Sequence, residues 1–375
     1  MPNRSHLAPL ALLPLLMAAA AGAAAPGPTP EVAAAAARID RATLAAAPRF
    51  LASDLLEGRG PGSRGDELAR AYLASELEAA GLAPGGPDGS WQQRFEMVGL
   101  RTRAPRTWTF AGAGGRADLA WWKDWIGAAG VQAPVAELRD AELVFAGYGI
   151  QAPEFEWDDF KGADLAGKVL ILVNDDPDWD PALFAGKTRL YYGRWTYKYE
   201  SAARQGAVGA ILVHTTPSAG YPWQVVQTSW SGEQFELPAK GEPRLQLASW
   251  TTEEAARRLV ALGGHDLDRL VAAARSRDFR PVPLGVTTSL RMDVDLHRVE
   301  TGNVLGRLPG SDPKLADQVV VYTAHHDHLG VGAADAGGDT IYNGALDNAT
   351  GCAQLLALAR AFAALPEPPR RSVLF

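Results

Sequence analysis

The residues best suited to chemistry gather in the stretch YTAHHDHLG, residues 322–330, which holds three of the chain's seven histidines and one aspartate. Val319–Val321 come just before it and predict a buried strand, and in α/β sheets ligands bind at the carboxyl ends of strands. Side chains two positions apart in an extended segment lie on the same face. Asp327 is therefore placed to accept a hydrogen bond from a metal-bound His325, while His326 faces the opposite side.

Three interpretations of this cluster compete. The histidines could form a solvated or hydrogen-bonded group without a ligand. They could belong to a His-x-His-x-Asp-His zinc signature, but the first histidine of that pattern falls at position 323, where the chain has Thr323. We favour the third interpretation, in which His325 binds a metal ion, Asp327 orients it, and His328 lines the site without binding.

A second polar signal follows in YNGALDNATG, residues 342–351. Asp347 lies just before an expected helix, which Asn348 or Thr350 could cap. Asp347 could simply be a carboxylate at the start of that helix. We favour a metal ligand instead, because a carboxylate there could bridge two metal ions, one of which His325 would complete.

Apolar patterns predict the elements that must hold these residues. Helices are expected at about residues 31–56 and 65–81, and the glycine-rich LLEGRGPGSRG between them is expected to be a surface turn. Short apolar runs, among them GKVLILVND at 167–175 and the expected strand Ala210–His214, predict a small α/β or β-rich module over about 140–250. A strand, helix and strand in that order near the end predict an α/β sheet with three layers.

Composition limits the possible classes of protein. The 375 residues are 47% hydrophobic and 21% charged, which is typical of a folded protein with two domains. The net charge of -7 is spread along the chain, and no basic stripe predicts nucleic-acid binding. Cys352 is the only cysteine, so the chain has no intramolecular disulfide.

The first 25 residues have the pattern of a secretory signal peptide. Arg4 precedes the apolar residues 7–22, and Ala23–Ala25 supply the small residues of a cleavage site. A membrane anchor is the alternative, but Pro9 and Pro14 weaken a spanning helix. We therefore expect an exported protein, periplasmic or extracellular, without a stable membrane anchor.

The motifs TAHHDHLG, YNGALDNATGCAQLLALARAFA and PPRRSVLF together resemble the M28 family of zinc-dependent aminopeptidases. The earlier stretch FLASDLLEGRGPGSRGDELARAYLASELEAAGL is similar to that family's N-terminal helical segment, and residues 140–250 are similar to an inserted protease-associated (PA) domain. The resemblance implies an α/β fold with a three-layer zinc-peptidase sheet, of which only the N-terminal part is present. Residues 26–139 and 251–375 would belong to the peptidase domain, around a β-rich PA-like insertion at 140–250.

The resemblance also implies roles at the site. His325 would bind one zinc ion, Asp347 would bridge two, and Asp327 would orient His325. The family's general-base glutamate and its other ligands are expected beyond Phe375, so the chain is expected to stop inside a strand and to be inactive alone.

The resemblance implies that the complete protein is an aminopeptidase that hydrolyses N-terminal bonds of peptides or proteins. The alternative is a non-catalytic PA/peptidase-like binding protein or an inactive fragment. The substrate's side-chain preference and the oligomeric state stay open.

Overall fold

The structure, a computed structural model, describes residues 27–39, 41–335 and 337–375. The predicted signal peptide, residues 1–25, lies outside the described residues. In the described part of the chain, no helix is both long and apolar enough to cross a membrane.

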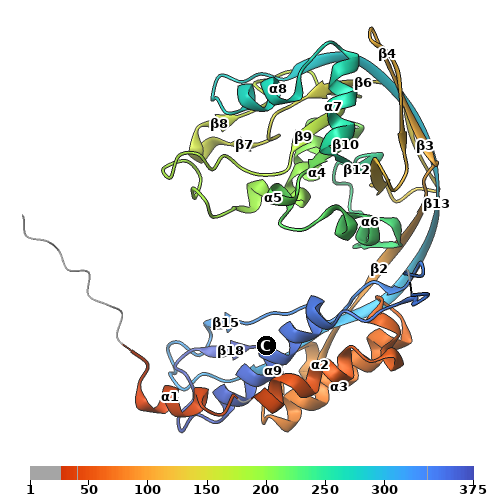
Figure 1. Cartoon of the computed structure of the whole chain (residues 1–375). Helices are drawn as coiled ribbons and strands as arrows, with labels where there is room; N and C mark the ends of the chain where they lie inside the picture. Colours follow the sequence, from red (N-terminus) through yellow and green to blue (C-terminus); the bar gives the residue numbers. More distant parts are fainter. Residues whose placement is uncertain (1–26, 40, 336) are drawn as a thin grey trace, which may run out of the picture.

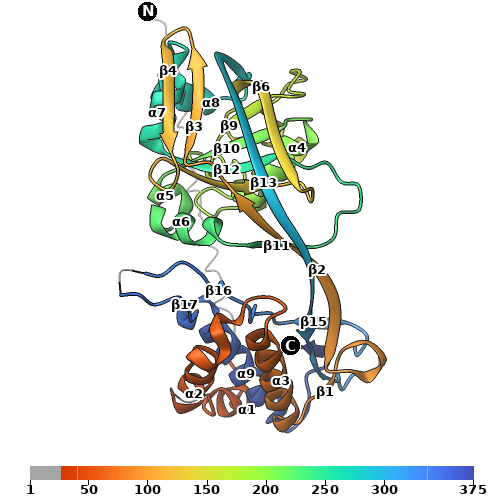
Figure 2. The same cartoon turned by 90° about the vertical axis from the view of Figure 1, so that its right-hand side faces the viewer.

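Two lobes, joined by two long strands, make up the described part of the chain (Figure 1). The small lobe comprises residues 27–91 and 305–375, and the large lobe comprises residues 92–304. Strands β2 (Gln92–Arg103) and β13 (Val282–Val304) pair antiparallel and run from the large lobe towards the small lobe (Figure 2). The first segment of the small lobe ends where β2 begins, and the second begins where β13 ends, so the pair also sets where the two segments meet.

The elements of the small lobe are α1 (Pro30–Ala36), α2 (Arg41–Leu51), α3 (Arg64–Ala79), α9 (Thr350–Ala363), β1 (Ala83–Pro84), β14 (Gly306–Leu308), β15 (Val319–Val321), β16 (Gly330–Val331), β17 (Ile341–Tyr342) and β18 (Ser372–Leu374). The remaining strands of the large lobe are β3 (Thr107–Gly112), β4 (Gly115–Ala120), β5 (Trp125–Ala129), β6 (Val135–Phe145), β7 (Gln151–Ala152), β8 (Trp157–Asp158), β9 (Val169–Val173), β10 (Gly209–His214), β11 (Gln234–Glu236) and β12 (Leu247–Thr252). Its helices are α4 (Trp195–Arg204), α5 (Thr216–Ala219), α6 (Trp223–Ser231), α7 (Glu253–Leu262) and α8 (Leu267–Ala274).

The large lobe is built on one sheet with the strand order β11-β2-β13-β6-β9-β10-β12-β5, and β3 pairs with both β13 and β4. β6, β9, β10 and β12 are parallel to one another. Helices cover both faces of these strands: Tyr199 of α4 and Val226 of α6 pack in the core of one face, and Leu259 of α7 and Leu270 of α8 in the core of the other. Burial on both faces explains why β9 and β10 are unbroken apolar runs in the sequence.

The small lobe has its own sheet of four short strands in the order β1-β14-β18-β15. β15 is parallel to β18, and β14 is antiparallel to it. Helices α2, α3 and α9 form one core with this sheet, in which Leu51, Leu77, Leu356 and Val373 are buried. The sequence marks the start of α3 clearly, because the Ser63 side chain accepts a hydrogen bond from the third residue of the helix.

The expectation of a buried strand at Val319–Val321 is wrong. The three valines of β15 are 44%, 42% and 55% exposed. β15 lies at the edge of the small sheet, and among the described strands it pairs only with β18. An apolar run predicts a strand but does not tell whether that strand is central or at an edge.

The predicted α/β class is confirmed, and the strands expected near residues 169–173 and 210–214 are present as β9 and β10. The hydrogen bonds of the large sheet cross both ends of the predicted PA-like segment, since β5 pairs with β12 and β13 pairs with β6. The boundaries at 139/140 and 250/251 therefore stay predictions about domains within one continuous sheet.

Candidate metal site

His325 and Asp347 meet at the carboxyl end of β15. The chain leaves β15 through Tyr322, whose N–H donates to Leu374 O at 2.9 Å, and reaches His325 three residues later. Asp347 comes from the irregular turn Ala345–Ala349, which leads into α9. His325 Nε2 lies 3.0 Å from Asp347 Oδ1, and both side chains are more than half exposed. The structure thus brings together the two residues that were expected to bind metal.

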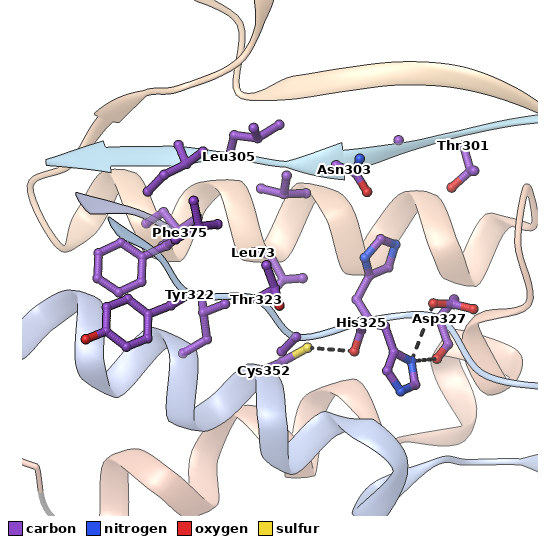
Figure 3. A pocket seen from close by; sticks show the side chains of 18 of the residues that line it. Leu73, Thr301, Asn303, Leu305, Tyr322, Thr323, His325, Asp327, Cys352 and Phe375 are labelled. Atoms are coloured by element: carbon purple, nitrogen blue, oxygen red, sulfur yellow. Dashed lines mark hydrogen bonds and ion pairs between the residues drawn. The ribbon is translucent and has the colours of Figure 1, made fainter. Parts of the chain in front are cut away.

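The other ring nitrogen of His325 faces Asp327 (Figure 3). His325 Nδ1 lies 3.1 Å from the main-chain oxygen of Asp327 and 3.5 Å from its Oδ1. The hydrogen bond with Asp327 raises the pKa of His325 to about 9. Burial alone would raise the pKa of Asp327, but the hydrogen bond and charge of His325 outweigh it and lower that pKa. A metal ion would therefore have to displace a proton from Nε2 of an imidazolium that both carboxylates stabilise.

The chemistry of this donor set fits zinc, which binds imidazole nitrogen and carboxylate oxygen. Nε2 and Asp347 Oδ1 point at each other, and Asp327 contacts the opposite nitrogen, as the partner of a metal-bound histidine does. A catalytic zinc ion usually has three protein ligands. Within the described ranges no group of three or more His, Cys, Asp or Glu side chains is arranged to hold a metal ion. The His325–Asp347 pair is therefore smaller than the usual protein ligand set of a catalytic zinc ion.

His326 faces the opposite side, as predicted. Its Nε2 lies 2.8 Å from Asp66 Oδ1, and its side chain is largely buried. The second oxygen of Asp66 accepts from Thr301 Oγ1 at 2.9 Å and from Gly62 N at 3.1 Å. His328 donates its main-chain N–H to Arg59 O at 3.2 Å. Within the described residues no hydrogen bond or ion pair joins either ring to Asp347, although burial lowers the pKa of His328 and the Asp347 carboxylate opposes that shift.

The first turn of α9 and the irregular turn before it both contact the His325 segment. Cys352 Sγ and Asn348 Nδ2 both donate to the main-chain oxygen of His325, each at 3.3 Å. Asn348 and Thr350 do not cap the helix start, because the Thr350 hydroxyl donates backwards to Leu346 O at 2.9 Å. Asn348 thus contacts the metal-site segment rather than its own helix.

Sequence reasoning missed Arg59 and Asp66. The stretch LLEGRGPGSRG, residues 55–65, was expected to be a surface turn, yet the Arg59 side chain within it and the Asp66 side chain directly after it are both fully buried. Burial lowers the pKa of Arg59, and the Asp327 and Asp347 carboxylates nearby oppose that shift. The signal that could have identified this stretch is the pair of charged residues among glycines, since charges are rarely buried without a specific partner.

Two cavities lie around the site. The first, of about 410 Å³, is lined by apolar residues of α3, β13 and α9 together with His325 and Asp327. Figure 3 shows His325 and Asp327 towards one end of it and the stacked rings of Tyr322 and Phe375 towards the other. The second is a cleft of about 720 Å³ lined by residues of both lobes, which include Trp122 and Glu233 of the large lobe and Gly60, Gly330 and Tyr342 of the small lobe. Gly60 directly follows Arg59, so this interlobe cleft adjoins the segments that hold the site.

Comparison with solved structures gives three similar proteins that cover 92% of this chain. They are an aminopeptidase from Aneurinibacillus sp. strain AM-1 (18% identity, TM-score 0.43), a peptidase M28 precursor from Shewanella amazonensis SB2B (17% identity, TM-score 0.42) and BSAP, a zinc aminopeptidase from Bacillus subtilis (16% identity, TM-score 0.33). The chain spans 63%, 66% and 60% of their respective lengths.

No curated protein matches the chain. A family model does: residues 303–375 match Peptidase family M28. This segment contains β14, β15, His325, Asp347 and α9, which are the elements on which the resemblance was based. This match confirms the predicted resemblance to peptidase family M28 for residues 303–375.

Proposed function

We propose that this chain supplies the His325–Asp347 ligand pair of a zinc-dependent peptidase. The observation that carries the proposal is the 3.0 Å approach of His325 Nε2 to Asp347 Oδ1, with Nδ1 of the same ring facing Asp327. In this arrangement Nε2 is the ring nitrogen that a metal ion would take from its proton, and a carboxylate lies beside it. The match of residues 303–375 to a peptidase family supports peptide hydrolysis as the reaction.

Each residue has a distinct role in this proposal. His325 would hold the metal through Nε2, Asp327 would keep the proton on Nδ1 and thus the ring's orientation, and Asp347 would offer its carboxylate as a further ligand. Bound zinc would supply Lewis acidity, which polarises a peptide carbonyl and lowers the pKa of a coordinated water. The general-base glutamate and the count of two ions remain predictions from the resemblance, as does the preference for N-terminal bonds.

The interlobe cleft is the place that we propose for the peptide substrate. It is open to solvent, its lining mixes aromatic, polar and charged side chains, and both lobes contribute to it. Trp122 is 40% exposed there, and its main-chain oxygen accepts hydrogen bonds from Trp223 Nε1 and Gln227 Nε2. The large lobe, with its PA-like segment at 140–250, would then shape access to the site rather than perform chemistry.

The ligand pair is tested by titrating the purified chain with Zn²⁺ in a calorimeter. We expect binding in the parent chain, and its loss in both His325→Ala and Asp347→Ala. Asp317→Ala is the matched control, because Asp317 is an exposed carboxylate of the same lobe. Zinc binding that survives both substitutions would contradict the proposal.

Hydrolysis is tested separately with leucine p-nitroanilide. Zinc-dependent turnover that both ligand substitutions abolish would support a peptidase. Zinc binding without turnover would favour the alternative, a non-catalytic binding protein. We also propose that the protein is exported, and N-terminal sequencing of the native protein checks this: a start at Pro26 is expected, whereas an intact Met1 would contradict it.

A further inference from the structure

Arg59 holds together three segments that are distant in the sequence. Its Nε donates to the main-chain oxygen of His326 at 2.7 Å, one Nη1 hydrogen bond goes to Asn343 O at 2.7 Å, and Nη2 donates to Gly344 O at 3.0 Å. Nη1 also donates to Leu51 O at the end of α2. The guanidinium is thus surrounded by four main-chain carbonyls, two of them in the segment just before Asp347 and one in the residue after His325.

The main chain around Arg59 also contacts the segments that its side chain holds. Arg59 O accepts from His328 N at 3.2 Å, so that Arg59 contacts the His325 segment through its side chain and its backbone. Gly58, at a φ of 69°, packs so closely that an added Cβ would lie 2.5 Å from Gly330 O and 2.6 Å from Tyr342 O. Gly330 and Tyr342 are paired in the β16–β17 hairpin, so the base of that hairpin is pressed against the Arg59 turn.

The burial of the Arg59 charge calls for an explanation, because burying a charged group costs free energy unless its hydrogen-bonding groups are all paired. The four main-chain carbonyls around Arg59, here called the carbonyl cage, offset that cost only if they are held at the positions to which the planar guanidinium donates. The guanidinium of arginine has N–H donors in fixed directions, whereas lysine has a compact ammonium at the end of a flexible side chain. The cage is therefore specific for arginine, and it fixes the distance between the segments that contribute the carbonyls.

We propose that Arg59 is the positioning residue of the metal site: it fixes the His325 and Asp347 segments relative to each other, so that both ligands are in place before a metal ion binds. His325 lies at the end of a loop from β15, and Asp347 is separated from it by the β16–β17 hairpin. Without Arg59 the two segments would lose their shared partner, and metal binding would have to order them at a cost in affinity. The part of this proposal that concerns metal rests on the proposed function, whereas the part that concerns the segments does not.

Hydrogen–deuterium exchange of the metal-free chain tests the positioning role directly. In Arg59→Met we expect exchange at the amides of His328 and Ala349, which donate to Arg59 O and Gly344 O, to become at least about tenfold faster, while β9 and β10 exchange as in the parent. Arg59→Lys should lie between the two. Arg64→Met is the control, because Arg64 is an exposed arginine five residues further along, and it should exchange like the parent.

A Zn²⁺ titration of the same variants then tests the consequence for the site. We expect affinity to fall roughly 10–100-fold in Arg59→Met, as for other groups that orient metal ligands, and to be unchanged in Arg64→Met. Unchanged exchange at both amides would overturn the proposal, as would acceleration spread evenly over both lobes. Local loosening with undiminished zinc affinity would also overturn it. If the segments loosen locally and the parent itself binds no zinc, the positioning of the segments is supported and the proposed metal function is what fails.

Discussion

The two lobes differ in what surrounds their strands, although each has an apolar core. In the large lobe every side chain of β10 is buried, and helices cover the parallel strands on both faces. In the small lobe every side chain of β15 is exposed, although this strand leads directly to the candidate site. Beneath the site segments the small lobe buries two charged groups, Arg59 and Asp66, whereas the buried charges of the large lobe, such as Asp159 and Lys198, lie beside its parallel strands. Apolar burial thus defines the scaffold of the large lobe, whereas hydrogen bonds from buried charges define the conformation of the site.

Each lobe uses one buried cation to hold main-chain carbonyls, but the cations differ. Lys198 in the large lobe donates to Tyr148 O and Asp175 O, both at 2.6 Å. Burial lowers the pKa of Lys198, so that its charge is sensitive to its surroundings. Arg59 serves the same purpose beside the site, and an arginine remains protonated even when burial lowers its pKa. The segments that carry His325 and Asp347 are therefore held by the cation whose charge does not change with pH.

The sharpest test of this contrast is to remove a buried charge from the small lobe. Asp66→Ala leaves His326 and Arg70 without the carboxylate that both contact. We expect the small lobe to lose about 3–5 kcal/mol of unfolding free energy, because breaking a buried ion pair leaves uncompensated partners. Exchange rates of α3 and α9 amides in increasing urea measure this loss, while the amides of β9 and β10 should report little change.

Glu67→Ala serves as the control, since Glu67 is exposed in the same turn of α3. A loss below about 1 kcal/mol in Asp66→Ala would mean that the Asp66 network is not what stabilises the small lobe. An equal loss in both lobes would mean that they unfold as one unit, and the comparison between them would fail.

The sequence predicts local features of this protein better than it predicts burial. The alternation of side chains in an extended segment predicted that Asp327 shares a face with His325 and that His326 lies on the opposite face. Apolar runs bounded by glycine predicted β9 and β10. The turn around Arg59 was misjudged because glycines near a helix start indicate a turn, and no local pattern tells which distant carbonyls will surround a side chain. The exposure of β15 was missed for a related reason: three valines predict a strand, but the strand's neighbours are set by the tertiary fold.

A smaller effect on stability is expected from substitutions in the neighbouring strands β15 and β18. Val320 and Val373 lie opposite each other in the parallel pair, yet Val320 is 42% exposed and Val373 only 2%. Val373→Thr should cost about 1–3 kcal/mol, because it buries a hydroxyl among apolar side chains. Val320→Thr should change stability by less than about 0.5 kcal/mol. Urea denaturation of both variants measures the difference, and a similar cost for the two would mean that the face of β15 is covered in solution.

The smallest expected effect is a pH dependence confined to the large lobe. His214 ends β10 with its ring 5% exposed, its Nε2 3.1 Å from Tyr221 O, and the rings of Tyr221, Trp223 and Trp250 around it. Burial lowers the pKa of His214 below its ordinary value. A group whose folded-state pKa is lowered contributes stability above its unfolded-state pKa, about 6.5, and that contribution is lost as the pH falls through the folded-state value.

We therefore expect the unfolding free energy of the large lobe to fall more steeply between pH 7 and pH 5 in the parent chain than in His214→Gln. Glutamine keeps a donor for Tyr221 O but does not titrate. Urea denaturation at the two pH values, with β9 and β10 exchange as the readout, measures the slopes. Parallel slopes would show that the ring is solvated enough to accept a proton freely. Apolar burial would then contribute less to the stability of the large lobe than its packing indicates. The two lobes would differ less in how they are stabilised.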